Sequence, residues 1–326
     1  MAYEKLNLTD KKILYELDFN SRNPVTVIAK KLKISRDVVT YRMKGFVEKG
    51  IIQKYHTIID IAKLGYTAHK YFIRFQSITE EKEKEFIEYV KNHPDIIYSA
   101  SYDGKFDSVI SIWARSVENL SESLREISEK FGSFLGEGEI ATIIKGEYSV
   151  RNYLIADKKY TKRYFFGSAP QPIKIDDTNK KILIELGKDA RITSVEIAKK
   201  LDISADAVYQ RIDKLEKSGI IQNYNIVPNE EKYPFIHYKL LVSLHNLNKN
   251  KKEQLEEYCR QHKNIWYFCT CLGPWNFEID LDMETSEDFR NFLKELRLNF
   301  SGIIKDYTVL TAYKTHKYNF CPSMPK

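Results

Sequence analysis

Apolar side chains in the first 55 residues recur at helical spacing in three short segments. Their apolar positions are Ile13, Leu14 and Leu17, then Val27, Ile28 and Leu32, and finally Val39, Met43 and Phe46. Thr9 or Asp10 can cap the first segment, Pro24 opens the second, and Ser35 caps a third that ends before Gly50. Three short helices with a tight turn between the last two are typical of a helix-turn-helix.

The following residues change from helical spacing to a mixture of helices and alternating strands. A strand-like stretch at 51–55 could form a wing or hinge. Strands are then predicted at 71–75, 96–100, 108–114 and 140–150, with helices at 80–91 and 117–131. The order β-α-β-β-α-β is that of a ferredoxin-like domain, so the predicted class is α+β.

The pattern then repeats at a constant offset of 169 residues. Residues 11–55 align without a gap on residues 180–224, and 22 of the 45 positions are identical. The alternation returns at Tyr238, Leu240, Val242 and Leu244. The chain is therefore predicted to hold two copies of one unit.

This repeat predicts five segments. They are helix-turn-helix domains at 1–60 and 173–228, ferredoxin-like domains at 61–150 and 229–326, and a linker at 151–172. The linker carries five basic residues and one acidic residue, and it ends in Gly, Ser, Ala and Pro. Its aromatic residues (Tyr153, Tyr160, Tyr164, Phe165 and Phe166) indicate that most of it packs on a domain, leaving the Gly-to-Pro end free; the alternative is a solvated linker.

Composition narrows the class of protein. The 326 residues are 43% hydrophobic and 30% charged, with a mean hydropathy of -0.46, and no apolar run is long enough to cross a bilayer. We expect a cytoplasmic protein without a signal peptide. The four cysteines show no metal-ligand or disulfide spacing, and Cys269 and Cys271 are expected to pack in a core. No nucleophile and base pair is evident, so we predict neither a catalytic site nor a metal or cofactor.

Excess positive charge lies in the first helix-turn-helix. The net charge is +7, and residues 5–55 alone hold 12 basic and 5 acidic residues, whereas residues 174–224 hold 10 and 9. An acidic partner is therefore favoured, with double-stranded DNA the first candidate. We expect the first module to bind DNA more tightly than the second.

The third helix of each module presents one polar face. Recognition helices read bases mainly with their N-terminal half. The residues predicted to touch DNA are Ser35, Arg36, Thr40, Tyr41, Arg42 and Lys44 in the first copy and Ser204, Tyr209, Gln210 and Arg211 in the second. Arg42 is interpreted as a phosphate or intrahelical contact. The alternative is a solvated helix of an interaction module.

Several segments of the chain form a recognisable set: residues 8–14, the turn from Ile28 to Ser35, Arg42, the Gly50-Ile51-Ile52 exit and Gly104-x-Phe106-Asp107. Through these segments the whole chain resembles the Lrp/AsnC family of transcription regulators. The resemblance implies that the helix-turn-helix binds DNA and that the second domain dimerises and binds a small effector, often an amino acid.

That resemblance also implies an effector loop between the second and third strands of each ferredoxin-like domain. The effector-binding residues it assigns are Asp103, Gly104, Phe106 and Asp107 in the first copy and Gly273, Trp275 and Asn276 in the second. Copy two lacks the carboxylate that could hold an ammonium, which favours ligand binding in copy one. A tight turn that needs glycine is the alternative in both copies.

Two arrangements and two rival functions stay open. The ferredoxin-like domains could pair within the chain, as an intramolecular pseudo-dimer on an asymmetric operator, or between chains as a homo-oligomer on a palindrome. A sirohaem decarboxylase-like enzyme shares this architecture, but no clear basic cluster is present for the carboxylates of a tetrapyrrole. A protein-binding adaptor is the third reading.

Overall fold

The computed structural model describes residues 4–155, 163–167 and 172–321 and shows the helical modules in both copies. The first comprises α1 (Leu8–Phe19), α2 (Val25–Leu32) and α3 (Arg36–Glu48), and the second α6 (Asp177–Lys188), α7 (Ser194–Leu201) and α8 (Ala205–Lys217). Ser35 caps α3 as predicted. Neither Thr9 nor Asp10 caps α1, because Asn7 does so. The Asn7 side chain accepts from the Asp10 amide, and the Asp10 carboxylate accepts from the Asn7 amide, which closes a capping box.

Each copy continues into the predicted β-α-β-β-α-β domain. The first is β2 (Thr67–Phe75), α4 (Glu80–Asn92), β3 (Ile96–Gly104), β4 (Ser108–Ala114), α5 (Val117–Phe131) and β5 (Leu135–Ser149). The second is β8 (Ile236–Leu244), α9 (Lys249–Gln261), β9 (Ile265–Leu272), β10 (Phe277–Met283), α10 (Ser286–Phe300) and β11 (Ile304–Tyr318). β5 begins earlier than predicted, because its first residues pair with β2.

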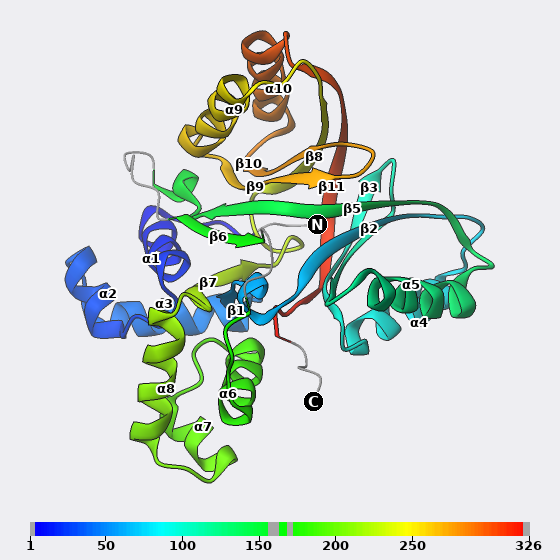
Figure 1. Cartoon of the computed structure of the whole chain (residues 1–326). Coiled ribbons are helices and arrows are strands. Elements are labelled where there is room, and N and C mark those ends of the chain that lie inside the picture. The colour runs from blue at the N-terminus through cyan, green and yellow to red at the C-terminus, as the bar shows by residue number, and fades with distance from the viewer. Residues whose placement is uncertain (1–3, 156–162, 168–171, 322–326) are drawn as a thin grey trace.

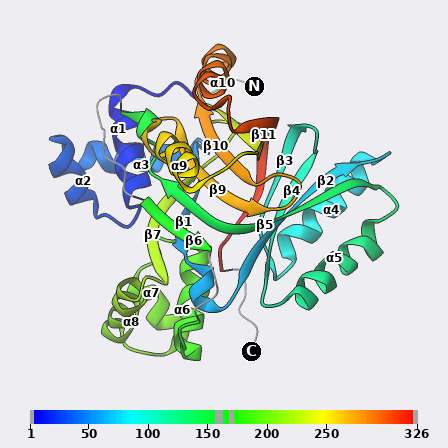
Figure 2. The same ribbon diagram turned by 45° about the horizontal axis from the view of Figure 1, so that its top comes forward.

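The two ferredoxin-like sheets join into one closed barrel. The strand order is β2-β4-β3-β11-β8-β10-β9-β5, and β5 also pairs with β2. The last strand of each unit makes the junction: β5 pairs first with β2 and then with β9, while β11 pairs first with β8 and then with β3. Figures 1 and 2 show α4 and α5 outside one half of the barrel and α9 and α10 outside the other. Closure leaves these eight strands without an open edge.

Closure buries both faces of the inner strands. Every residue of β4 and of β10 is buried. On β10, Phe277, Ile279 and Leu281 belong to the apolar cluster under α9 and α10. The alternate residues, which include Glu278 and Asp280, therefore face the barrel interior. A sequence that alternates like a half-exposed strand thus places carboxylates inside a barrel.

The predicted wing or hinge joins the two helix-turn-helix modules. β1 (Ile52–Ile59) pairs antiparallel with β7 (Ile221–Pro228) in a two-stranded ribbon. Two arginines at equivalent positions of the repeat add a reciprocal contact: Arg22 donates to the carbonyls of Ala190 and Ile192 at 2.6 and 2.9 Å, and Arg191 donates to the Ser21 carbonyl. The two modules are therefore linked to each other as well as to the barrel.

The described parts of the segment between the units pack on both domains. A short 3-10 helix at Asn152–Leu154 is buried, and β6 (Arg163–Gly167) pairs with β5. Tyr164 and Phe166 are buried, whereas Phe165 is exposed. Tyr160 and most of the Gly-to-Pro end lie outside the described residues. Figure 1 shows β6 beside β5.

Burial of His56 on the ribbon predicts a loss of stability in acid. Its ring is fully buried beside Tyr318 and Phe320, and neither ring nitrogen has a hydrogen-bond partner among the described residues. Burial holds the pKa of His56 well below its ordinary value, and the nearby Lys54 lowers it further. Below about pH 6.5 the unfolded chain therefore binds a proton at this histidine that the folded chain does not bind. This lowers the free energy of unfolding by up to about 1.4 kcal/mol for each pH unit.

His56→Phe removes the titrating group and keeps a ring. Urea unfolding of this variant should lose roughly 2 kcal/mol less than the parent between pH 7 and pH 5. His245→Gln, which replaces an exposed histidine, is the control for the loss of an imidazole. An identical pH dependence in the parent and in His56→Phe would contradict the assignment.

Candidate nucleic-acid interface and barrel cavity

The polar face of α3 is open to solvent. Val39, Met43 and Phe46 are buried against the other helices, as predicted. The exposed residues of the opposite face include Arg36, Thr40, Tyr41 and Lys44. The Tyr41 side chain stands well clear of the surface, with 75% of its area exposed. The Ser35 hydroxyl instead accepts from the Val38 amide at 3.2 Å, so part of its hydrogen-bonding capacity is used by the cap.

Arg42 does not make an intrahelical contact. Its guanidinium lies 3.0 Å from the Asp10 carboxylate on α1, with the Arg42 side chain partly exposed. Arg211 repeats this contact in the second copy: it reaches Asn179 of α6, the residue equivalent to Asp10, at 2.9 Å, and Asp176, which caps α6, at 2.6 Å. Both arginines therefore join the third helix to the first helix of their own module, where they can position the third helix.

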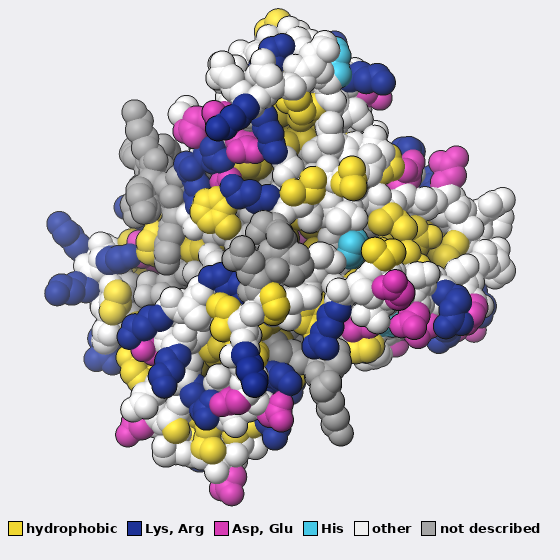
Figure 3. All heavy atoms as spheres, viewed as in Figure 1, with side chains coloured by type: hydrophobic (Ala, Val, Ile, Leu, Met, Phe, Trp, Pro, Cys, Tyr) yellow, Lys and Arg dark blue, Asp and Glu magenta, His cyan; other side chains and the backbone are white. Residues whose placement is uncertain are grey.

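The equivalent face of α8 is less basic. Tyr209 and Gln210 are exposed, as on α3. The position equivalent to Lys44 is Asp213, whose carboxylate binds Lys217 at 2.7 Å. Figure 3 shows Lys and Arg side chains projecting at the left edge of the molecule around α2, whereas the lower module of α6–α8 mixes basic and acidic side chains.

The predicted effector loop of copy one is built into a turn. Gly104 has a φ of +130°, a conformation that favours glycine. The Asp107 carboxylate accepts from Arg74 at 2.9 Å and from the Phe75 amide at 2.7 Å, and Phe106 is fully buried in the barrel. Asp103 is exposed.

The loop of copy two makes equivalent contacts without a charge. The Asn276 side chain accepts from the Leu244 amide at 2.8 Å and donates to the Leu244 carbonyl at 3.1 Å. Trp275 is buried, and its ring nitrogen donates to Glu278 at 3.1 Å. A Cβ at Gly273 would lie 2.6 Å from the carbonyl oxygen of Ile140 on β5.

Gly273→Ala is therefore expected to destabilise the junction between the units. The added methyl group would force β9 away from β5, at a cost of about 1–3 kcal/mol in urea unfolding. Gly302→Ala is the matched control, because a Cβ there meets nothing within 4 Å. Equal stability of both variants would count against a packing role for Gly273 and favour a role in ligand approach.

The barrel holds a partly open cavity at its helix-turn-helix end. The cavity volume is about 70 Å³, enough for several water molecules. Side chains from every barrel strand line it, together with Arg151, Phe166 and the end of β7. The aromatic residues in its wall are Tyr98, Tyr148, Phe166, Tyr233, Phe235, Trp266, Tyr267, Tyr318 and Phe320.

Buried ion pairs surround this cavity. The Lys70 ammonium lies 2.5 Å from the Glu278 carboxylate, and the Lys239 ammonium lies 2.6 Å from Asp280, which also binds His237 at 2.8 Å. Burial alone would raise the pKa of Asp280, but Lys239 and His237 hold it well below its ordinary value. Burial likewise opposes the charge of Lys70, yet Glu278 raises the pKa of Lys70 above its ordinary range.

Arg151 connects this charged interior to the first helix-turn-helix. Its guanidinium donates to Asp18 of α1 at 2.8 Å and lies 3.4 Å from Asp282 of β10. The Trp266 ring nitrogen donates to the other Asp282 oxygen at 3.0 Å. Burial raises the pKa of Asp18 above its ordinary value, although Arg151 opposes this shift.

The charges around the cavity are not shared equally by the two copies. Lys70 and Lys239 are equivalent in the repeat, but the carboxylates of β10 have no acidic counterparts: Glu278, Asp280 and Asp282 correspond to Val109, Ser111 and Trp113. Sequence reasoning missed this cluster because alternate polar residues on a strand normally face water. Three acidic residues at every second position of a strand were the available signal.

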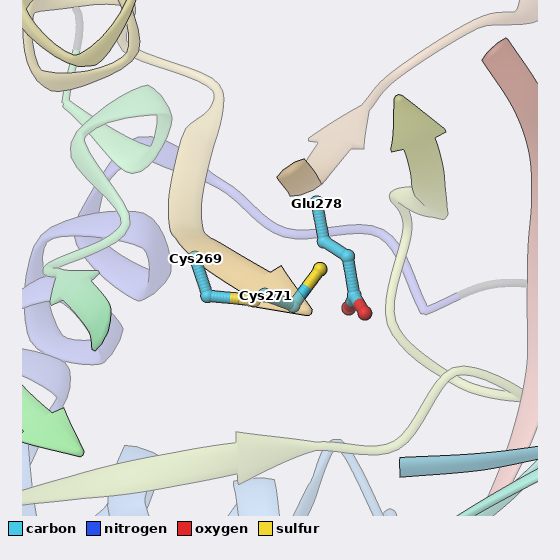
Figure 4. A group of neighbouring side chains, drawn as sticks. All are labelled: Cys269, Cys271 and Glu278. Carbon is cyan, nitrogen blue, oxygen red and sulfur yellow. The ribbon is translucent and has the colours of Figure 1, made fainter. Parts of the chain in front are cut away.

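Cys269 and Cys271 are buried on one strand, as expected for core side chains. Figure 4 shows both beside Glu278, and the sulfur and carboxylate atoms lie within 4.8 Å of one another, a spacing that could hold a metal ion. The Lys70 ammonium already binds Glu278, however, and the Cys271 sulfur contacts the Trp275 carbonyl at 3.6 Å. His93 and His262 cap the C-terminal ends of α4 and α9.

Comparison with known proteins matches both helical modules and a length of about one unit. A family model of winged helix-turn-helix DNA-binding domains matches residues 6–53 and 175–222. The HTH-type transcriptional regulator LrpA of Pyrococcus horikoshii is 39% identical over 140 residues, 41% of this chain and 92% of that protein. An uncharacterized HTH-type transcriptional regulator of Pyrococcus furiosus is 31% identical over 137 residues, 42% of this chain and 90% of that protein.

Solved structures of one enzyme match nearly the whole chain. The siroheme decarboxylase NirDL aligns over 98% of this chain and 95% of its own, with a TM-score of 0.59 and 14% sequence identity. At such a low sequence identity, the match shows a similarity of fold alone. No helix in the described part of the chain is long and apolar enough to cross a membrane.

Proposed function

Because the chain belongs to the Lrp/AsnC family of helix-turn-helix transcriptional regulators and carries the family's unit twice, we propose that it is a sequence-specific DNA-binding regulator acting in the cytoplasm. The observation that carries the proposal is the exposed polar face of α3, with Arg36, Tyr41 and Lys44 open to solvent in a strongly basic module. Such a face offers hydrogen bonds to base edges and cations to phosphates.

We further propose that one polypeptide presents both recognition helices to one duplex. The ribbon of β1 and β7 and the contacts of Arg22 and Arg191 tie the modules together, and the barrel pairs the units strand to strand. Since Arg36 and Lys44 are replaced by Ala205 and Asp213 in the second copy, the operator should be asymmetric, with the stronger half-site under α3.

Selection of binding sites from random DNA tests this proposal. The intact chain should select an asymmetric site and protect it as a one-to-one complex, while disabling α8 should shorten the footprint and disabling α3 should abolish it. A palindromic site bound by a single chain would contradict the asymmetric assignment. Binding that does not depend on salt would contradict DNA recognition itself and favour an adaptor.

Modulation by a small molecule such as an amino acid is a finer part of the proposal. Asp103 is the one acidic residue of the two predicted loops whose side chain is exposed, so it is the group that could hold an ammonium there. Asp103→Asn should remove the effect of the amino acid on DNA binding. An unchanged response would exclude this loop as the effector site.

A tetrapyrrole enzyme is the second candidate, favoured by the whole-chain fold match to a siroheme decarboxylase. Its substrate carries several carboxylates, which need available cations. The buried cations Lys70, Lys239 and Arg151 are all paired with carboxylates, and buried carboxylates outnumber these three cations around the cavity, so a further carboxylate is disfavoured there. The regulator therefore remains the preferred function, and a visible absorption band of bound tetrapyrrole in the purified protein would reverse that preference.

A further inference from the structure

The cavity inside the barrel has walls suited to an organic cation. Aromatic rings dominate its surface, and the protein already places cations on them. The Lys70 ammonium lies 4.8 Å from the ring centre of Tyr267, and the Arg151 guanidinium lies 4.7 Å from that of Trp266. Ring faces attract positive charge most strongly where water is excluded. Other rings of the wall, such as Tyr148 and Phe166, remain available to an apolar body.

The charges around the cavity favour a cation over an anion. Four buried carboxylates lie around the cavity (Asp18, Glu278, Asp280 and Asp282), against the cations Lys70, Lys239 and Arg151 and the ring of His237, which binds Asp280. Glu230 adds a half-buried carboxylate to the wall, where it accepts from Thr315. An uncompensated buried charge is costly, so an added cation would offset the excess whereas an added anion would enlarge it.

The asymmetry of the repeat makes this charge imbalance specific to the fused chain. Of these two equivalent strands, only β10 carries carboxylates, because β4 has Val109, Ser111 and Trp113 at the equivalent positions. A barrel of two identical units would have these carboxylates on both strands or on neither. The strand carboxylates around the cavity therefore all come from the second unit.

We propose that this cavity binds a small primary amine, with its ammonium at the β10 carboxylates Asp280 and Asp282 and its apolar body against the aromatic rings. A volume of about 70 Å³ accommodates roughly five or six non-hydrogen atoms. The site differs from the effector loops, since it lies inside the barrel and is lined by both units.

The position of the cavity couples it to the helix-turn-helix modules. Val227 and Pro228 of the ribbon line it, and Arg151 binds both Asp18 of α1 and Asp282 of the wall. Occupancy is therefore expected to alter DNA affinity, a consequence that rests on the proposed function. Amine binding is measured without DNA, so the proposed amine site and the proposed DNA-binding function can be refuted independently.

Calorimetry on the intact chain tests the site with three probes of one shape. Isobutylamine is the cation, isobutanol the neutral analogue and isobutyrate the anion. The amine should bind at least tenfold more tightly than the alcohol, and the acid should bind least. Absence of amine binding, or an acid that binds as tightly as the amine, would overturn the proposal.

Two variants test whether the amine binds in the cavity. Asp280→Asn removes one carboxylate and should weaken isobutylamine at least tenfold. Ala68→Leu keeps every charge but fills the space beside the Ala68 methyl group, which lines the cavity, and should abolish binding. Glu122→Gln on the exposed surface of α5 is the control and should bind the amine like the parent. If both cavity variants fold and still bind the amine like the parent, the site lies elsewhere.

Discussion

Replacing Arg36 and Lys44 together with alanine is expected to weaken DNA binding by the whole chain about 100-fold near 0.15 M salt. Both side chains lie on the exposed face of α3. A base contact is worth about 1–3 kcal/mol, and a lost phosphate contact lowers the salt dependence by about one unit of slope. Fluorescence anisotropy on the selected operator, repeated at several salt concentrations, measures both effects.

Control variants distinguish DNA recognition by α3 from the effect of the overall charge of the protein. Lys82→Ala with Lys84→Ala removes the same amount of charge from the exposed surface of α4 and should change affinity little. Lys214→Ala, on the exposed surface of α8, should also have a small effect. Circular dichroism confirms that each variant is folded. Parent-like affinity of the double alanine variant would refute α3 as the recognition helix.

Arg151→Met is expected to destabilise the chain by about 3–5 kcal/mol. The guanidinium is the buried partner of Asp18 and also lies beside Asp282, so its loss leaves two buried carboxylates without this cation. Because Arg151 connects α1 to β10, the first helix-turn-helix should also lose one of its contacts with the barrel. Urea unfolding measures the change in the free energy of unfolding.

A double variant shows whether the charge, and not the loss of packing, causes the effect. Arg151→Met combined with Asp18→Asn removes one of the stranded carboxylates and should recover part of the lost stability. Arg125→Met breaks an exposed pair with Glu129 and should cost less than about 0.5 kcal/mol. If the second substitution adds its own full cost to the first, the two side chains are not coupled.

The repeated sequence alone predicted the elements of both units. Helical spacing of Val39, Met43 and Phe46 identified the buried side of α3, and this prediction is confirmed because local periodicity reports which side of a helix avoids water. The helix start at Asn7 was missed, since Thr9 and Asp10 are also good capping residues and the choice depends on the capping box. The contact of Arg42 with Asp10 was missed because it joins two helices.

The same reasoning predicted the location of some, but not all, of the candidate site residues. Exposure of Thr40, Tyr41 and Lys44 follows from the helical pattern, whereas contact with DNA stays a prediction. The loop residues Phe106 and Trp275 were assigned to a ligand, and the structure places both side chains in the barrel, a location that depends on the pairing of the units.

The amino-acid sequence by itself determined the two-unit organisation, the order of helices and strands, and the basic character of the first module, since these depend on short-range periodicity and on simple charge counts. The tertiary structure alone decided where Glu278, Asp280 and Asp282 lie. The alternation of polar and apolar residues on β10 is compatible with a strand that exposes its polar face to solvent. That face is buried because the long strands β5 and β11 pair with strands of the other copy and close the barrel. Burial of a strand face depends on strands distant in sequence, so no local pattern reports it.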